Sequence, residues 1–260
     1  MSSDEVNVPA TGNGSDKHKN FFSLLGGVYF SPGEAFREIG RSPGVLIPIV
    51  VLIILGVLSG LYLANTLDMQ SMARAQLEQA VDRGGITEEQ MEQQLALVSR
   101  FIGIQTLVGS AISGLLLCLA ISGFAKLFSI FVGAENSYKG LLAVTVYTML
   151  VISVVQFVLF VLILSFKPPG EVTLSNLGSL IASNLGALLA MVGIEDALPN
   201  FLMRLAGYVD LFAIWAIVLL AIGYAAVSRK LKTATAATWL GVAYGVIAVI
   251  GSAIAMLIGS

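Results

Sequence analysis

Five long apolar stretches, separated by polar or charged segments, constrain the fold of this chain more than any other feature. They cover residues 44–64, 102–124, 141–166, 209–227 and 237–258. Each meets the length of about 20 apolar residues needed to cross a hydrocarbon core roughly 30 Å thick. Lipid offers no water to backbone polar groups, so the spans should be α-helices, which bond internally. We therefore predict an all-α integral membrane protein with a five-transmembrane-helix bundle over residues 44–260.

Composition supports a membrane protein. The 260 residues are 57% hydrophobic and only 12% charged, whereas a soluble domain carries about 25% charged residues. The net charge of -2 argues against a nucleic-acid partner. The single cysteine, Cys118, lies within the second stretch, so a disulfide within one chain is impossible, and we expect this residue to pack as a small hydrophobe.

The amino-terminal region divides into two parts. Residues 1–20 are polar and have no apolar core, which predicts a disordered cytoplasmic tail rather than a secretory signal. Residues 21–43 contain an apolar run too short to span, so we predict an interfacial amphipathic segment. Its expected membrane anchors are four aromatic residues: Phe21, Phe22, Phe30 and Phe36. A packed lead-in that shields the base of the bundle is a compatible alternative.

A capping signature lies inside this segment. Ser31 precedes Pro32, and Glu34 follows, so the Ser31 side chain is expected to cap a helix that Pro32 begins. Gly40 and Pro43 should end that helix before the first span.

Positive charges beside the spans predict the orientation. With the amino terminus cytoplasmic, the inner side holds Lys17, Lys19, Arg37, Arg41, Lys126, Lys139, Arg229, Lys230 and Lys232. The outer side then holds Arg74, Arg83, Arg100, Lys167 and Arg204. This bias favours an inner amino terminus and an outer carboxyl terminus.

Two predicted outer segments exceed simple turns. Residues 68–100 are acidic and rich in glutamine, and they should form helical extensions of the first two spans with a turn at Gly84 and Gly85. A second capping signature begins at Thr87. This hairpin either offers a partner surface or is solvated without a partner.

The other outer segment, residues 167–204, contains leucines interrupted by polar residues and glycines. A sixth span through residues 174–192 would place the basic cluster at Arg229, Lys230 and Lys232 outside. An interfacial or re-entrant helix is therefore preferred over a sixth span.

Small residues predict how the helices pack. Gly56 and Gly60 form one GxxxG pattern, and Gly241 and Gly245 form another. Such faces allow close backbone approach, a main source of attraction between helices in lipid. Packing within the chain is the first expectation, and a homodimer contact is the alternative.

Functional residues are sparse. Asp210 begins the fourth stretch on the predicted outer side, where it should fix the helix start as a structural polar residue, with Arg204 or Lys167 as a basic partner. The central parts of the stretches contain no acidic residue, which a coupled carrier usually needs. The pattern HExxH, a Walker loop, GxGxxG and CxxC are all missing, and no histidine or cysteine cluster exists. We predict no enzyme activity, no cofactor and no metal.

Three segments resemble the prokaryotic members of the Yip-one (Ypt-interacting protein) domain family. They are the lead-in at residues 29–39 with Pro43, the run at residues 136–139, and the apolar helix at residues 210–223. The resemblance covers about residues 21–258 and implies a five-span bundle with a cytoplasmic amino terminus. Eukaryotic relatives act in Golgi and endoplasmic-reticulum vesicle traffic and bind Rab-type GTPases. Their Asp-Leu-Tyr-Gly-Pro and Gly-Tyr-Gly motifs do not occur here, which argues against GTPase binding.

These observations together favour a non-enzymatic membrane scaffold or accessory protein that acts through protein or lipid contacts, in membrane organisation or a trafficking-like role. A small-solute or lipid permease is the alternative. Expected partners are membrane lipids and an unidentified membrane protein or a second copy of the chain. The expected location is a bacterial cytoplasmic (inner) membrane, or a Golgi or endoplasmic-reticulum membrane in a eukaryotic cell.

Overall fold

The structure is a computed structural model that describes residues 20–166, 181–194 and 197–258. These residues form ten helices, and they contain one isolated β-bridge but no strand. The predicted disorder of residues 1–20 falls almost wholly outside the described residues, as do residues 174–180 of the predicted interfacial or re-entrant helix. The prediction of an all-helical chain is confirmed for the described part.

Four helices are long and apolar enough to cross a membrane. They are α3 (Leu46–Thr66), α5 (Glu88–Phe131), α6 (Tyr138–Ser165) and α11 (Thr233–Ile258). They contain the first, second, third and fifth predicted stretches. At 1.5 Å per residue, the 21 residues of α3 extend about 31 Å, which is the thickness of a hydrocarbon core.

The fourth stretch does not form a full-length span. Helix α10 (Leu211–Ala226) has 16 residues and extends about 24 Å, shorter than the core of a bilayer. An independent span over residues 209–227 is therefore not confirmed by the length of this helix, and it stays a prediction. Val209 lies outside the helix because Asp210 is already its N-cap, and Val227 is its C-cap.

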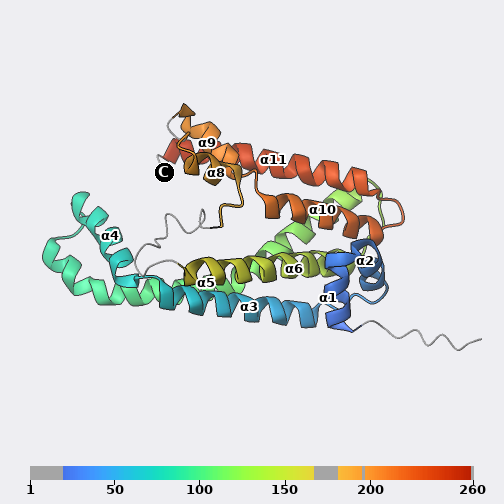
Figure 1. Cartoon of the computed structure of the whole chain (residues 1–260), viewed down its shortest axis with the longest axis horizontal. Coiled ribbons are helices and arrows are strands. Elements are labelled where there is room, and N and C mark those ends of the chain that lie inside the picture. Colours follow the sequence, from blue (N-terminus) through green and yellow to red (C-terminus); the bar gives the residue numbers. More distant parts are fainter. Residues whose placement is uncertain (1–19, 167–180, 195–196, 259–260) are drawn as a thin grey trace, which may run out of the picture.

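The long helices run along the long axis of the molecule (Figure 1). Helices α3, α5 and α6 pack against one another, while α10 contacts both α6 and α11. Helix α10 thereby joins the α3–α5–α6 group to α11. One end of the molecule carries α1 and α2, and we call it the lead-in end; the opposite end carries α4, and we call it the hairpin end.

The lead-in consists of α1 (Phe21–Phe30) and α2 (Pro32–Arg41), which contact α6, while α2 also contacts α10. Pro32 begins α2 as expected, but the Ser31 side chain makes no capping bond. Its backbone carbonyl instead accepts hydrogen bonds from the amides of Glu34 and Ala35, both at 3.1 Å. The prediction of side-chain capping by Ser31 is wrong, and the Ser31 backbone (φ −147°, ψ 60°) departs from the extended conformation typical of an N-cap.

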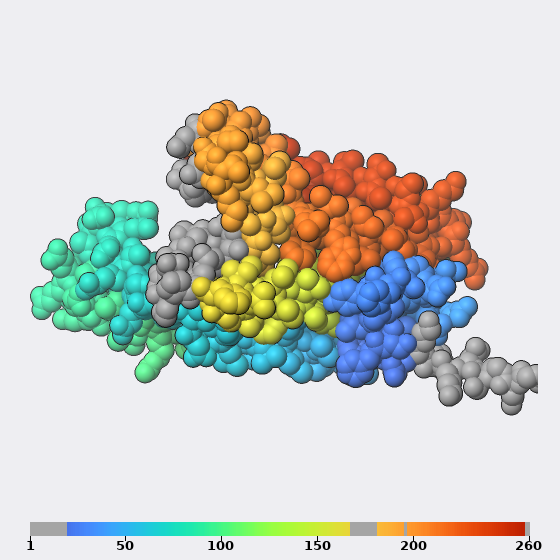
Figure 2. Space-filling view, in the orientation of Figure 1, coloured from blue at the N-terminus to red at the C-terminus, as the bar shows by residue number. Residues whose placement is uncertain are grey.

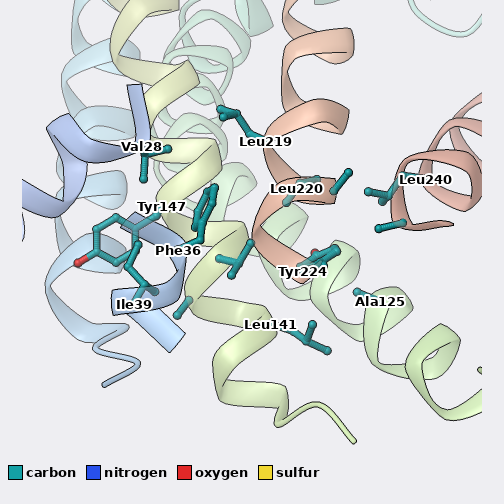
Figure 3. Close-up of a cluster of buried hydrophobic side chains, with 14 of the residues drawn as sticks. Val28, Phe36, Ile39, Ala125, Leu141, Tyr147, Leu219, Leu220, Tyr224 and Leu240 are labelled. Carbon is teal, nitrogen blue, oxygen red and sulfur yellow. The ribbon is translucent and has the colours of Figure 1, made fainter. Parts of the chain in front are cut away.

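The largest buried cluster lies where the lead-in, α6 and α10 meet (Figure 3). Phe36 of α2 and Tyr224 of α10 are both 0% exposed. The hydroxyl of Tyr224 lies 2.7 Å from Oγ1 of Thr145 on α6, so the buried phenol has a hydrogen-bond partner. Trp239 of α11 stacks on Phe128 of α5 with ring centroids 4.2 Å apart. This cluster holds the lead-in end together.

The hairpin end projects beyond the rest of the bundle (Figure 2). Helix α4 (Met69–Asp82) is separate from α3 because Asp68 caps it, accepting from the amides of Gln70 and Ser71. The turn contains Gly84 at a φ of 70°, a conformation that favours glycine. The predicted signature at Thr87 is a complete capping box at the start of α5.

Two short helices, α8 (Leu185–Met191) and α9 (Asn200–Gly207), pack against each other, and α9 contacts α11. They lie beside the hairpin-end part of α11 (Figure 1).

Candidate functional site

A groove between α3, α5 and α6 is the first candidate site. Its volume is about 350 Å³, and each of the three helices contributes to its lining. Pockets for small ligands begin at about 300 Å³. Its polar lining residues are Ser59, Ser110, Ser113, Ser153 and Gln156, and its aromatic ones are Phe157 and Phe160. We call it the α3–α5–α6 groove.

Glycines on α3 let this helix approach α5 closely beside the groove. A Cβ at Gly56 would clash with the carbonyl oxygen of Ser110, and one at Gly60 would lie 3.0 Å from the Cα of Leu107. The predicted small-residue face on α3 therefore packs directly on α5. This close approach brings Ser110 and Ser113 of α5 beside α3.

The polar side chains of the groove differ in whether they have a hydrogen-bond partner. The hydroxyls of Ser59 and Ser110 donate within their own helices, to the carbonyls of Leu55 at 2.8 Å and Thr106 at 2.7 Å. In contrast, the side chains of Ser113, Ser153 and Gln156 make no hydrogen bond to the described part of the chain. An unpaired amide in lipid is unfavourable, so these three donors favour a hydrogen-bonding ligand.

The groove lies near the middle of the first span. The hydroxyl of Tyr62 donates to the carbonyl of Val161 at 3.4 Å, which aligns the parallel helices α3 and α6. Counting back along both helices places Gln156 level with Val57. Because α3 runs from Leu46 to Thr66, this level is close to its midpoint.

The start of α10 is the second candidate site. Asn184 and Asp210 form an isolated antiparallel bridge, with the amide of Leu211 donating to the carbonyl of Ser183 at 2.9 Å. The Asp210 carboxylate accepts from the amide of Ala213 at 2.9 Å and from the hydroxyl of Ser183. We call this arrangement the Ser183–Asp210 junction.

Counted along the helices, the junction lies level with α6 before the end of that helix. The contact between Tyr224 and Thr145 aligns α10 with α6, and Asp210 lies 14 residues before Tyr224. That offset corresponds to residue 159 of α6, which continues to Ser165, about 9 Å further. Figure 1 shows the start of α10 beside the middle of α11.

Asp210 caps the start of α10, as a residue expected to fix that helix start would. This acidic side chain is at a helix start but not at the outer boundary of the bundle, because α10 begins part-way along α6 and α11. Its hydrogen-bond partners are the neutral groups of Ser183 and Ala213 rather than Arg204, and Lys167 lies outside the described residues. Sequence reasoning missed Ser183, since it is 27 residues away in the chain.

The family model described as the Yip1 domain matches residues 26–256. The chain belongs to the Yip1 domain family. The match runs from α1 to near the end of α11 and confirms the resemblance noted in the lead-in and in residues 210–223. No curated protein and no solved structure matches the chain. Family and apolar helices together identify a Yip1-family membrane protein.

The four expected anchors of this Yip1-domain chain occupy different environments. Phe22 and Phe30 are 78% and 89% exposed, which suits an interfacial anchor. The ring of Phe21 packs on Tyr147 of α6, with centroids 5.9 Å apart. Phe36 is 0% exposed and belongs to the core, so the expectation that it anchors the chain in lipid is wrong. Amphipathic spacing cannot distinguish lipid from the bundle as the cover of an apolar face.

The two GxxxG patterns of the Yip1-domain chain also differ. Gly56 and Gly60 meet α5, but a Cβ at Gly241 or Gly245 would have nothing within 4 Å. The glycines of α11 therefore make no close contact within the described chain. The predicted packing role of Gly241 and Gly245 would need a contact with a second molecule or with residues outside the described ones.

Basic residues stabilise the lead-in end. The Lys126 ammonium donates to the carbonyl of Asn136 at 2.7 Å, and that of Lys230 to the carbonyl of Gly133 at 3.1 Å. The first contact joins α5 to the loop between α5 and α6, and the second joins that loop to the one between α10 and α11. Among the described residues, no group of three or more His, Cys, Asp or Glu side chains is arranged to hold a metal ion.

Proposed function

We propose that this Yip1-domain protein is a non-enzymatic membrane scaffold or accessory protein that acts through protein or lipid contacts, in membrane organisation or a trafficking-like role. The projecting α4–α5 hairpin supports the proposal most directly. Helix α5 has 44 residues, about 66 Å, which is twice the length needed to cross a hydrocarbon core. A bundle needs no such extension for its own packing.

The hairpin is a folded surface rather than a loose connection. Ala73 and Leu77 of α4 are buried, and Arg74 forms an ion pair with Glu92 of α5 at 2.5 Å. Glu78 and Glu89 are exposed on it. Acidic side chains on a rigid projection suit a partner with a basic surface.

Affinity purification from native membranes tests this role. We expect a partner in stoichiometric amount with the wild-type chain, and its loss from the double variant Glu78→Lys and Glu89→Lys. Glu34→Lys, an exposed charge reversal at the lead-in end, is the matched control and should retain the partner. A partner held equally by all three proteins would contradict a role for the hairpin.

A small-solute or lipid permease is the second candidate. The unpaired donors of the α3–α5–α6 groove and the depth of the Ser183–Asp210 junction favour it, because transport sites lie near the middle of the membrane beside interrupted helices. Solute or lipid flux through the purified protein in liposomes would replace the scaffold proposal with this one.

The proposed orientation has the amino terminus in the cytoplasm and the carboxyl terminus outside, in a bacterial cytoplasmic membrane. It is supported by the distribution of charge: Arg37, Arg41 and Lys126 lie towards the lead-in end, as do Lys139 and the cluster around Lys230. Basic residues favour the cytoplasmic side.

A further inference from the structure

We propose that the α3–α5–α6 groove binds an uncharged lipid with carbonyl groups on a ring, of the isoprenoid quinone type. The inference deepens the lipid half of the proposed function and rests on it. It begins from the three unpaired donors of the groove, the hydroxyls of Ser113 and Ser153 and the amide of Gln156.

Charge restricts the ligand first. None of the described residues that line the groove is charged. A phosphate or carboxylate headgroup would enter a site of low dielectric without a counter-charge, which is strongly unfavourable. The ligand is therefore neutral.

The position of the groove along the helices restricts the class of ligand further. Gln156 is level with Val57, near the midpoint of α3. With α3 placed across the hydrocarbon core, this amide is about 15 Å from either edge. The headgroup and ester groups of a phospholipid belong to those edges. A neutral lipid without a headgroup charge can instead bring its polar atoms to the middle of the bilayer at small cost.

The lining also indicates which polar atoms are needed. Hydroxyl and amide donors match carbonyl acceptors. Phe157 and Phe160, on the same helix as Gln156, add aromatic surface to the same groove. Aromatic side chains pack favourably on a planar ring. A quinone combines a planar ring, carbonyl acceptors and an apolar tail, and the volume of about 350 Å³ admits a ring with the first part of that tail.

The test uses the full-length protein in phosphatidylcholine nanodiscs with a photoactivatable short-chain isoprenoid quinone. We expect saturable labelling of peptides from the groove. Gln156→Leu should weaken binding about fivefold, which corresponds to the roughly 1 kcal/mol of a hydrogen bond in lipid. Ser113→Phe, which fills the groove, should abolish labelling. Gln105→Leu removes an exposed amide of α5 outside the groove and should bind as the wild type does.

Equal labelling of the wild type, Gln156→Leu and Ser113→Phe would overturn the proposal. Loss of quinone labelling in the presence of excess phosphatidylglycerol, or of an equal concentration of diacylglycerol, would also overturn it. Thermal melting verifies that each variant is folded. Partner capture by Gln156→Leu in native membranes separates the groove site from the scaffold role. If this variant loses quinone binding but keeps the partner, the groove site is supported independently of the partner. If the wild type captures a partner but binds no quinone, only the groove site is overturned.

Discussion

At the scale of single residues, a few buried polar contacts fix the helices relative to one another. The hydroxyl of Tyr29 in the lead-in donates to the carbonyl of Val151 on α6 at 2.6 Å. Thr145 and Tyr224 make a similar link between α6 and α10. Each links segments more than 70 residues apart in the sequence, so these contacts specify tertiary structure rather than local folding.

Tyr29→Phe should lower the free energy of unfolding by about 1 kcal/mol, since it removes this hydrogen bond and little apolar surface. Burial raises the pKa of the Tyr29 phenol above its ordinary value of 10.0. The contact therefore contributes fully below pH 10 and is lost as the pH rises through the raised pKa. Thermal melts of both proteins from pH 8 to 11 provide the measurement. Their difference in stability should shrink at the alkaline end, and a constant difference would show that this phenol does not titrate with folding.

Asp210 permits a second residue-level prediction. Asp210→Asn should retain most of the thermal stability in detergent, because an amide can accept from Ala213 and donate to Ser183. Asp210→Leu removes both bonds and the helix cap, at a cost of about 0.5–2 kcal/mol or more. Ser183→Ala should fall between the two. If both Asp210 variants are stable but solute flux disappears, Asp210 is a transport residue rather than a structural one.

At the scale of elements, the lead-in is a packed part of the bundle rather than a separate surface helix. Its buried residues Val28, Phe36 and Ile39 lie in the same cluster as Tyr147 and Tyr224 (Figure 3). Its exposed aromatics, Phe22 and Phe30, remain free to contact the membrane interface. The two roles predicted for this segment therefore belong to different faces of α1 and α2.

Phe36→Ala should destabilise the protein by about 3–5 kcal/mol, the usual cost of emptying an aromatic site in a core. Phe22→Ala, the matched control on an exposed face, should change stability by less than about 0.5 kcal/mol. Hydrogen exchange over residues 30–39 is the readout, and it should accelerate only for Phe36→Ala. Equal acceleration by both changes would mean that the interface, not the core, holds the segment.

The two glycine patterns predict opposite outcomes for one substitution. Gly56→Leu should disrupt the contact of α3 with α5, because even a Cβ would clash with the Ser110 carbonyl. Gly241→Leu should leave the monomer folded, since the space beside Gly241 is open in the described chain. Thermal stability and size in detergent distinguish these effects. Loss of a dimer on Gly241→Leu, with an intact monomer, would assign this pattern to contact between two copies.

At the scale of the whole molecule, the arrangement of the long helices determines which loops share an end. Helices α1 and α2 lie at the same end as the connection between α10 and α11, while α4 lies at the other (Figure 1). The α10–α11 connection contains Arg229, Lys230 and Lys232. Combined with the preference of basic residues for the cytoplasm, this arrangement gives a testable topology.

Cysteine labelling in a Cys118→Ala background tests that topology. An impermeant reagent added outside should modify Gly85→Cys and spare Thr233→Cys until the membrane is permeabilised. Reaction at Thr233→Cys in intact cells would invert the α10–α11 connection and overturn the orientation.

Most of the helices follow from the sequence alone. Runs of about 20 apolar residues predicted α3, α5, α6 and α11 because backbone hydrogen bonds must be satisfied internally in lipid. The capping box at Thr87 was also predictable, since its partners lie three residues apart. The polar members of the groove were visible only as isolated Ser and Gln residues within apolar stretches.

Tertiary structure alone decided which surfaces meet. The same apolar character occurs in Phe22, which is exposed, and in Phe36, which is covered by α6 and α10. Helix α10 begins beside a bridge between residues far apart in the chain, Asn184 and Asp210. Hydropathy measures the preference of a segment for an apolar environment, whereas packing between distant helices determines whether lipid or protein provides it.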